Sequence, residues 1–328
     1  MENIASFDNT FKLSWFEKRC RQIIFSVLEK LASDSVELVE AGQVIHFGAK
    51  AGVKSDTKAL HGVICIHDPK AYVKFVKGGS IGAAEAYIDN LWSSPELTTV
   101  IEIFAKAQQL TDKIERKSGL LSKLKNTLFH QLNKNSESGA KKNILAHYDL
   151  GNELYKRFLD PQMMYSAAVY RSENTSLAEA QLHKLDLICQ RLDLSADDHL
   201  IEIGTGWGGM AIFAAQHYGC KVTTTTISDE QYAYAKKRIE SLNLTDKITL
   251  LKQDYRNLEG QFDKLVSIEM IEAVGYQYMD SFFQQCESLV KPNGKMLIQA
   301  ITIADQRFEH YLHNVDFIQR YLFPGGFL

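Results

Sequence analysis

The stretch Leu-Ile-Glu-Ile-Gly-Thr-Gly-Trp-Gly-Gly, residues 200–209, decides the fold of this chain. It begins as a short apolar strand that carries one acid, Glu202, and it breaks into a glycine-rich turn that opens a helix. Gly204, Gly206 and Gly208 let the backbone adopt positive φ and approach a ligand closely, while the start of the helix presents N–H groups without intrahelical partners. The stretch therefore predicts a site for a nucleotide-like cofactor.

The spacing of the glycines is compatible with two classes of cofactor site. Gly204, Gly206 and Gly209 satisfy the Gly-x-Gly-x-x-Gly pattern of dinucleotide-binding folds. Those folds place an acid about 20 residues further on to hold the ribose hydroxyls, but residues 223–228 read Thr-Thr-Thr-Thr-Ile-Ser and contain no acid. Glu202 instead fits the Glu-x-Gly-x-Gly-x-Gly turn of S-adenosylmethionine (SAM) methyltransferases. A structural turn without a ligand is the remaining alternative.

Length and composition fit a chain of two globular domains. The sequence has 328 residues, of which 45% are hydrophobic and 23% charged, and its net charge is −3. It shows no signal-peptide pattern and no apolar stretch of about 18 residues, so we expect a cytoplasmic protein that is neither secreted nor membrane-spanning. The five cysteines form no Cys-x-x-Cys pair, and His310 and His313 lack a third ligand nearby. No disulfide framework and no metal site is expected.

One segment carries a strong local positive charge. Residues 113–142 contain eight Lys and Arg and two Glu, a balance of +6, and their leucines repeat with helical spacing. This pattern is typical of a basic amphipathic helix on an anionic membrane surface. An interdomain helix whose apolar face packs on the protein is the alternative. Nucleic acid is a poorer fit, because no aromatic-basic platform accompanies the charge.

The order of the predicted elements indicates where one domain ends and the next begins. Residues 1–132 form a smaller, mixed α+β amino-terminal domain that includes the basic amphipathic segment, and the polar residues 133–140 are the linker. In residues 141–328 strands alternate with helices, which predicts an α/β domain whose parallel sheet binds ligands at the carboxyl ends of its strands. Strands are expected at 200–203, 221–227, 247–252, 263–268 and 295–302, and helices at 207–217, 229–242 and 276–290. In the first domain we expect strands within 35–53 and 62–66, a helix at 69–76 and a glycine turn at 78–82.

Further motifs identify a family. They are His-Tyr-Asp-Leu-Gly-Asn-Glu-Leu-Tyr at 147–155, Tyr-Ser-Ala-Ala at 165–168, Glu-Met-Ile-Glu-Ala-Val-Gly at 269–275, Gln-Ala-Ile at 299–301 and Phe-Pro-Gly-Gly at 323–326. Together with the glycine turn they resemble the cyclopropane-fatty-acyl-phospholipid synthase family, which includes mycolic-acid and plant members. The resemblance is strong over residues 141–328 and fainter over the first domain, which is similar to the family's lipid-associated domain. It implies a class I SAM-methyltransferase (Rossmann-like) fold.

The resemblance also implies an activity. Family members transfer the methylene of SAM onto the cis double bond of unsaturated phospholipid acyl chains, and a bicarbonate ion takes the proton as the cyclopropane ring closes. A fatty-acyl C-methyltransferase that leaves a methyl or methylene branch is the nearest alternative, and a lipid-binding homologue without catalysis is the third. The implied partners are SAM, bicarbonate and unsaturated phospholipids at the inner face of the membrane, where the protein would associate peripherally. Nucleic acid is not expected, and a homodimer stays open.

The matching motif positions imply the site residues. SAM contacts are expected from Tyr165, Ser166, Glu202, Gly204, Gly206, Gly208, Thr226, Gln231, Asp254 and Tyr255. The catalytic group comprises Glu272, which orients the bicarbonate, together with Gln299, Ile301, Ala167 and Tyr148. The rings of Tyr148 and Tyr165 would stabilise a passing cation, while Tyr155 and Phe158 are expected in a helix core. Glu272 could instead cap the following helix, and the role of Glu269 is undecided.

Two positions depart from the family pattern. Many synthases have a cysteine at the position of Ala167 and a histidine at the position of Gln299. The cysteine acts through its backbone, so alanine is tolerated, and Gln299 can still donate an N–H to an anion although it cannot become cationic. Family members also continue beyond Phe-Pro-Gly-Gly and carry a bicarbonate-binding tyrosine there. We therefore expect either a piece of a longer protein or a shortened protein with an incomplete site.

Overall fold

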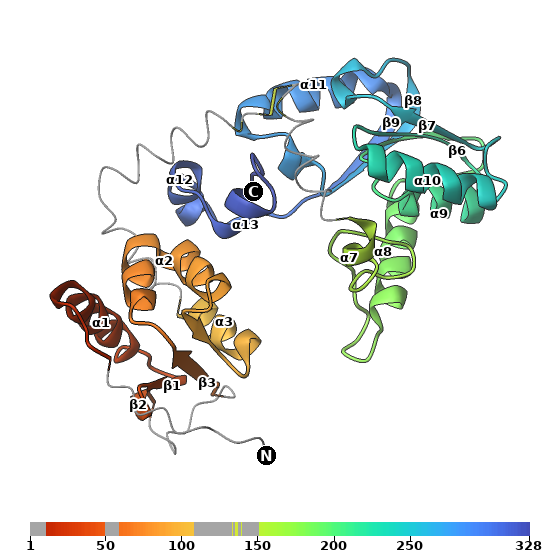
Figure 1. Cartoon of the computed structure of the whole chain (residues 1–328). Helices are drawn as coiled ribbons and strands as arrows, with labels where there is room; N and C mark the ends of the chain where they lie inside the picture. Colours follow the sequence, from red (N-terminus) through yellow and green to blue (C-terminus); the bar gives the residue numbers. More distant parts are fainter. Residues whose placement is uncertain (1–10, 50–58, 108–132, 134, 137–138, 140–150) are drawn as a thin grey trace. The chain divides into compact units, whose positions relative to one another are not determined.

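The chain forms two compact units in a computed structural model, Met1–Asn126 and Thr127–Leu328 (Figure 1). The structure describes residues 11–49, 59–107, 133, 135, 136, 139 and 151–328. Tyr148 and nearly all of the basic segment 113–142 therefore lie outside the described residues. In the described ranges, no helix is both long enough and apolar enough to cross a membrane.

The first unit contains a mixed sheet with helices packed on it. The strands are β1 (Ser35–Glu40), β2 (Gln43–Gly48), β3 (His61–Ile66) and β4 (Trp92–Ser93), in the order β2-β1-β3-β4. The helices are α1 (Trp15–Leu28), α2 (Lys70–Ile88) and α3 (Leu97–Lys106). β1 pairs antiparallel with β2 and parallel with β3. The predicted glycine turn appears as a kink inside α2, where Gly79 has a φ of 54°, a conformation that glycine adopts without steric cost.

The core of the first unit follows from two periodicities. Every second residue of β1 is buried, including Val36 and Leu38. On α1, Cys20, Ile24 and Leu28 are spaced by four residues, share one face and are buried in the same cluster. The first unit therefore has a hydrophobic core of its own.

The second unit is built on a parallel sheet. Its strands are β5 (His199–Ile203), β6 (Lys221–Thr226), β7 (Ile248–Lys252), β8 (Phe262–Ile268) and β9 (Val290–Gln299), in the order β7-β6-β5-β8-β9. Its longer helices are α8 (Leu177–Arg191), α9 (Gly209–His217), α10 (Asp229–Ser241) and α11 (Met279–Leu289). α9 contacts β6 and β7 and α10 contacts β7, whereas α11 contacts β8 and β9 (Figure 1). The strand order reverses between β5 and β8, and such a reversal leaves a crevice at the carboxyl ends of the strands.

The structure confirms the predicted fold class and changes several boundaries. α8 was not predicted, although Ser176 and Glu179 form a capping box at its start. α11 begins later than predicted because Tyr276–Tyr278 form a 3-10 turn after Gly275, whose φ is 85°. β9 begins at Val290 and has a register shift against β8, so it is longer than the predicted strand.

Candidate active site

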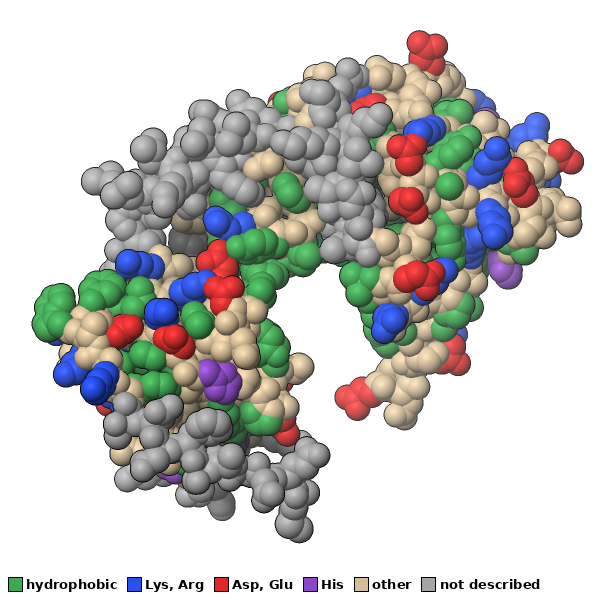
Figure 2. Space-filling model, viewed as in Figure 1, with side chains coloured by type: hydrophobic (Ala, Val, Ile, Leu, Met, Phe, Trp, Pro, Cys, Tyr) green, Lys and Arg blue, Asp and Glu red, His purple; other side chains and the backbone are tan. Residues whose placement is uncertain are grey.

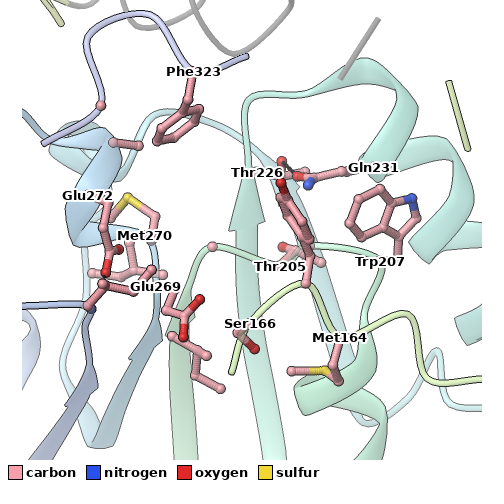
Figure 3. A pocket seen from close by; sticks show the side chains of 18 of the residues that line it. Met164, Ser166, Thr205, Trp207, Thr226, Gln231, Glu269, Met270, Glu272 and Phe323 are labelled. Atoms are coloured by element: carbon pink, nitrogen blue, oxygen red, sulfur yellow. Dashed lines mark hydrogen bonds between the residues drawn. The ribbon is translucent and has the colours of Figure 1, made fainter. Parts of the chain in front are cut away.

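A pocket of about 720 Å³ opens at the carboxyl ends of β5, β6 and β8 in the second unit, and most of its wall is apolar (Figure 3). The predicted site residues that line it are Tyr165, Ser166, Glu202, Gly204, Gly206, Thr226, Gln231, Asp254, Tyr255, Glu272 and Ile301. Ala167 and Gln299 do not line it themselves but donate hydrogen bonds to Glu269, which does.

The glycine turn has one position where the backbone is open to a ligand. Gly206 has a φ of 53°, and a Cβ built on it would meet no atom within 4 Å. Gly204, with a φ of 103°, is closed off by Met270, whose side chain would lie 3.1 Å from such a Cβ. Gly208 caps α9 and faces Ala235 of α10 at 3.3 Å, so it packs the turn and is not among the residues that line the pocket.

Glu202 lies beneath the turn as a buried acid. It is 3% exposed, and the hydroxyl of Thr224 donates to its Oε2 at 2.6 Å. The Thr224 hydroxyl also lies 2.7 Å from that of Thr205, which belongs to the turn itself. Burial raises the pKa of Glu202 to about 8, because an apolar environment penalises the charged form. At neutral pH Glu202 is therefore mostly a neutral carboxylic acid that ties β5 to β6.

The wall at the end of β6 is polar and fixed. The hydroxyl of Thr226 donates to Oε1 of Gln231 at 2.9 Å, and Gln231 is 5% exposed. The hydroxyl of Ser228 caps α10 by accepting a hydrogen bond from the backbone N–H of Gln231 at 3.3 Å. Asp254 accepts the amide of Arg256 at 3.0 Å after the end of β7. These groups offer hydrogen bonds to a polar ligand without needing to reorganise.

Two buried polar residues of α8, which the sequence did not reveal, hold Ser166 in place. Lys184 is 2% exposed and donates to the Ser166 hydroxyl at 2.5 Å, while Gln181 Nε2 donates to the Ser166 carbonyl at 2.8 Å. Burial lowers the pKa of Lys184 to about 8, although the charges of Glu269 and Asp160 oppose the shift. The sequence does contain a sign of this role, because Gln181 and Lys184 are polar residues within the apolar face of α8. That sign could not be interpreted, since the helix itself was not predicted.

Two carboxylates lie on the pocket wall beyond β8, opposite Thr226 and Gln231 (Figure 3). Oε1 of Glu269 accepts the Ala167 amide and Gln299 Nε2, each at 2.8 Å. Oε1 of Glu272 accepts the Ile301 amide at 2.6 Å.

Glu272 is the more deeply buried of the two carboxylates. It is 6% exposed, and its Oε2 has no hydrogen-bond partner among the described residues. Burial, assisted by the charge of Glu269, raises its pKa. Glu272 therefore favours its protonated form more than an exposed glutamate does.

Aromatic rings surround the entry to the glycine turn. Tyr155, at the end of α7 (Asn152–Tyr155), is 2% exposed and packs on Trp207 with ring centroids 4.8 Å apart. Tyr165 packs edge-on against Tyr155 at 5.2 Å. Phe158 was expected in a helix core, but it is 51% exposed and lines the pocket because α7 ends before it.

The last described segment closes one side of the pocket over Glu272. It contains α12 (Asp305–His313) and α13 (Phe317–Tyr321). The Phe327 amide donates to the Glu272 carbonyl at 2.8 Å, and Gln319 Nε2 donates to the Gly326 carbonyl at 2.9 Å. The apolar residues that this segment adds to the wall include Ile318, Leu322, Phe323 and Phe327.

The described residues contain no group of three or more His, Cys, Asp or Glu that could hold a metal ion. His313 is exposed and lies 3.5 Å from Glu309 of the same helix. Asn135, within the predicted linker, is 3% exposed and donates to the Gly325 carbonyl at 2.8 Å.

Comparison with known proteins agrees with this geometry. The chain is 36% identical over 271 residues to the tuberculostearic acid methyltransferase UfaA1 of Mycobacterium tuberculosis, and 35% identical over 266 residues to the cyclopropane-fatty-acyl-phospholipid synthase of Escherichia coli. These matches cover 80% and 81% of this chain, but 63% and 66% of the relatives, so the chain spans less than two thirds of their length.

Solved structures give the same result for the fold. The mycolic acid cyclopropane synthase CmaA1, solved with SAH and CTAB, superposes with a TM-score of 0.53 at 29% identity, over 57% of this chain and 69% of that one. The cyclopropane synthase MmaA2 from Mycobacterium tuberculosis gives 0.52 at 29% identity, over 57% and 68%. The mycolic acid cyclopropane synthetase family model matches residues 135–328. The resemblance seen in the sequence is confirmed, and the chain belongs to the mycolic acid cyclopropane synthetase family.

Proposed function

We propose that this chain is a SAM-dependent enzyme that transfers a one-carbon unit onto the cis double bond of an unsaturated phospholipid acyl chain and closes a cyclopropane ring. The observation that carries the proposal is that the open glycine at Gly206 and the carboxylates Glu269 and Glu272 line one largely apolar pocket. A polar cofactor and an apolar chain can meet there away from water. A reaction between a sulfonium methyl and a weakly nucleophilic alkene requires such a site.

The residues around the turn fit SAM. The free space at Gly206 is a cradle that a side chain would fill, and the start of α9 supplies N–H groups. Thr226 and Gln231 would hold the ribose and methionine portion, and Asp254 and Tyr255 would lie beside the adenine. When bound, SAM supplies an electrophilic methyl group on a positively charged sulfur. The part of the chain is to orient that methyl group and exclude water.

The apolar side of the pocket suits an acyl chain. Ile318, Leu322, Phe323 and Phe327 present hydrocarbon to the interior, and Phe323 lies across the pocket from the glycine turn (Figure 3). Burial of a lipid tail there is favourable by about 0.8 kcal/mol per CH₂ group. The aromatic rings near Trp207 can stabilise a transient positive charge by cation–π attraction.

A methyl or methylene branch is the second candidate product. The 36% identity to a tuberculostearic acid methyltransferase supports it as well as the 35% identity to a cyclopropane synthase supports ring closure. Gln299, which cannot become cationic, is compatible with either product. A homologue without catalysis would leave the carboxylate pair without a function.

A membrane surface is the proposed source of the substrate. On α1, Trp15 is 75% exposed, Phe16 44% and Ile23 41%, and Lys18 and Arg19 are exposed on the same helix. Figure 2 shows hydrophobic side chains beside Lys and Arg over this part of the first unit. Aromatic residues flanked by cations are typical of helices that lie at a lipid interface. Peripheral association would bring the pocket to its substrate without a membrane-spanning helix.

A bicarbonate ion is the proton acceptor that the family resemblance implies. The overall reaction needs a base beside the reacting carbons, and it proceeds equally if the base is a carboxylate of the chain. The identity of that base is a separate question.

The test is product analysis with SAM carrying a carbon-13 methyl group. We expect the protein, incubated with vesicles of unsaturated phospholipid, to place the label in a cyclopropane methylene that NMR of the extracted lipid identifies. Gly206→Val should abolish SAM binding in calorimetry, because the new side chain occupies the cradle. Gly42→Val is the matched control, since Gly42 also has positive φ and open space but lies in the first unit.

Each result has a definite reading. Label in a methyl or methylene branch would establish the second candidate instead of ring closure. A folded Gly206→Val protein that binds SAM with native affinity would remove the cofactor assignment. If the protein binds SAM but the lipid carries no label, the third alternative, a lipid-binding homologue without catalysis, would be supported.

A further inference from the structure

We propose that Glu269 is the base of this reaction and that its carboxylate occupies the place that the family resemblance assigns to bicarbonate. The inference rests on the proposed function, because it names the group that accepts the proton. It replaces a dissolved ion by a side chain of the protein itself.

The N–H donors expected to hold the ion already bind carboxylates of the chain. The amide of Ala167 and Nε2 of Gln299 both donate to Oε1 of Glu269 at 2.8 Å. The amide of Ile301 donates to Oε1 of Glu272 at 2.6 Å. A bicarbonate ion would have to displace a carboxylate from these donors and would then lie beside the displaced carboxylate, whose negative charge repels an anion. The residues present therefore do not fit a bound bicarbonate.

The backbone holds Glu269 between the end of β9 and the glycine turn. Glu269 comes directly after β8 and has a φ of 48°, a left-handed conformation that residues other than glycine rarely adopt. Its amide donates to the Gln299 carbonyl at 2.8 Å, which ties it to the end of β9. The next residue, Met270, packs on Gly204 of the cofactor turn. Strain of this kind persists only where surrounding contacts maintain it, and functional sites are where it concentrates.

The two carboxylates differ in the groups that surround them. Two N–H donors meet Oε1 of Glu269, and the buried ammonium of Lys184 interacts with its charge. Hydrogen bonds and cations of this kind stabilise a carboxylate as an anion. Among the described residues, Oε2 of Glu269 receives no hydrogen bond and remains able to accept a proton. Glu272, by contrast, is buried with an unpaired Oε2 and has a raised pKa.

The proposed step conserves atoms and charge. Methyl transfer breaks the S–C bond, whose electron pair stays on sulfur, and the π electrons of the alkene form the new C–C bond. The other alkene carbon is left positively charged. Glu269 then removes one proton from the new methyl group, and the electron pair of that C–H bond closes the third side of the ring. If a hydride first shifts from the methylated carbon to the positively charged carbon, the electron pair of the same C–H bond forms a double bond to the methylated carbon instead, and the product is a methylene branch. Glu269 ends as a carboxylic acid and returns its proton to water between turnovers.

The experiment compares two substitutions at Glu269 in buffer depleted of carbon dioxide. Glu269→Gln keeps the shape but cannot accept the proton, so we expect turnover to fall by about 10²–10⁴-fold, the usual contribution of a general base. Glu269→Gly suits the left-handed backbone and frees the Ala167 and Gln299 donors for a small anion. We expect added formate or bicarbonate to restore turnover in Glu269→Gly but not in Glu269→Gln. Glu240→Gln, an exposed position on α10, is the control that should keep native activity.

The wild-type protein provides the decisive comparison. We expect its turnover to be the same with and without bicarbonate, and all variants to bind SAM with native affinity in calorimetry. The proposal is overturned if wild-type turnover requires bicarbonate, if Glu269→Gln keeps the native rate, or if folded Glu269→Gly is not rescued by either anion.

A direct binding measurement separates this inference from the proposed function. Carbon-13 bicarbonate is titrated with wild-type protein and with Glu269→Gly, and binding is read from its NMR line width. Binding to the glycine variant alone supports the occupation of the anion site by Glu269, even if no lipid product forms and the proposed function fails. Binding of bicarbonate to the wild-type protein contradicts it.

Discussion

Glu202, the acid in the stretch that decides the fold, changes its proton affinity when the chain folds. In the folded protein it is 3% exposed and its pKa is raised to about 8 by burial. In the unfolded chain the same carboxyl is in water and ionises near its ordinary value of 4.5. Between these two pH values the folded state holds a proton that the unfolded state has lost. The stability that Glu202 contributes is therefore complete below pH 4.5 and is lost as the pH rises through 8.

Glu202→Gln should remove this part of the pH dependence. The amide cannot ionise, so the variant should gain stability relative to the wild type as the pH rises from 5 to 8, by a few kcal/mol at about 1.4 kcal/mol per pKa unit. Urea unfolding at a series of pH values measures the difference. Parallel stability curves for the two proteins would show that Glu202 is ionised in the folded state. Glu230→Gln, an exposed position on α10, is the control and should follow the wild type.

At the scale of single residues, motifs predicted some site positions and could not predict others. Gly206 could be predicted because the glycine turn is visible in the sequence itself, and Thr226 because its position matches the family pattern. Glu269 stayed undecided because its role depends on the register between β8 and β9, which brings Gln299 to it. Lys184 was missed because the sequence alone does not show which polar residue of a helix faces inward. Contacts between distant segments were the missing information in both cases.

Among the helices, α10 does more than cover the sheet, because Arg238 joins it to two neighbouring loops. Its guanidinium donates to the carbonyls of Gln162 and Trp207, each at 3.0 Å, and to Oε1 of Gln162 at 2.8 Å. Trp207 belongs to the glycine turn, and Gln162 precedes the segment that carries Tyr165. One side chain thus fixes both loops against the helix.

Arg238→Met should loosen this junction while keeping the apolar part of the side chain. We expect a loss of about 2 kcal/mol in the free energy of unfolding, the usual value for hydrogen bonds to a charged group. SAM binding should also weaken, because the glycine turn loses an anchor. Lys237→Met, at an exposed position of the same helix, should change neither quantity. Arg238→Lys should recover little, since an ammonium lacks the planar fork that reaches both loops. Full recovery by lysine would mean that charge alone matters.

At the scale of the whole molecule, the chain has separate cores in its two units. The alternation of strands and helices was enough to predict the parallel sheet, since β5 and β7 are short runs rich in apolar residues and β6 is a run of β-branched Val and Thr. The mixed sheet of the first unit was harder to predict from the sequence, because β1 pairs in parallel with β3 and antiparallel with β2. Local periodicity predicts that a strand exists but not which strand lies beside it.

The proposed membrane association can be tested by separating charge from apolar contact. Binding to vesicles that contain anionic phospholipid should fall as salt rises, because surface attraction is screened beyond roughly 10 Å at 0.1 M salt. Lys123→Glu with Lys125→Glu, in the segment outside the described residues, should abolish the salt-sensitive part. Trp15→Ser with Phe16→Ser should weaken the part that persists at high salt. If vesicle binding is unchanged by salt and by both double variants, neither the basic segment nor the exposed aromatic residues of α1 contacts the membrane.

The position of Trp207 gives the molecule an optical property. The chain has three tryptophans, of which Trp15 is 75% exposed, Trp92 is 7% exposed in the first unit, and Trp207 is 1% exposed and lines the pocket. The indole Nε1–H of Trp207 donates to Oδ1 of Asn152 at 2.7 Å, and the ring of Tyr155 packs against the indole. Light absorbed by this buried indole should be emitted at shorter wavelength than the emission of the exposed Trp15, as should the light absorbed by Trp92. A ligand that enters the pocket should change the emission of Trp207 and leave that of Trp92 unchanged, so the protein would report its own occupancy without an attached dye.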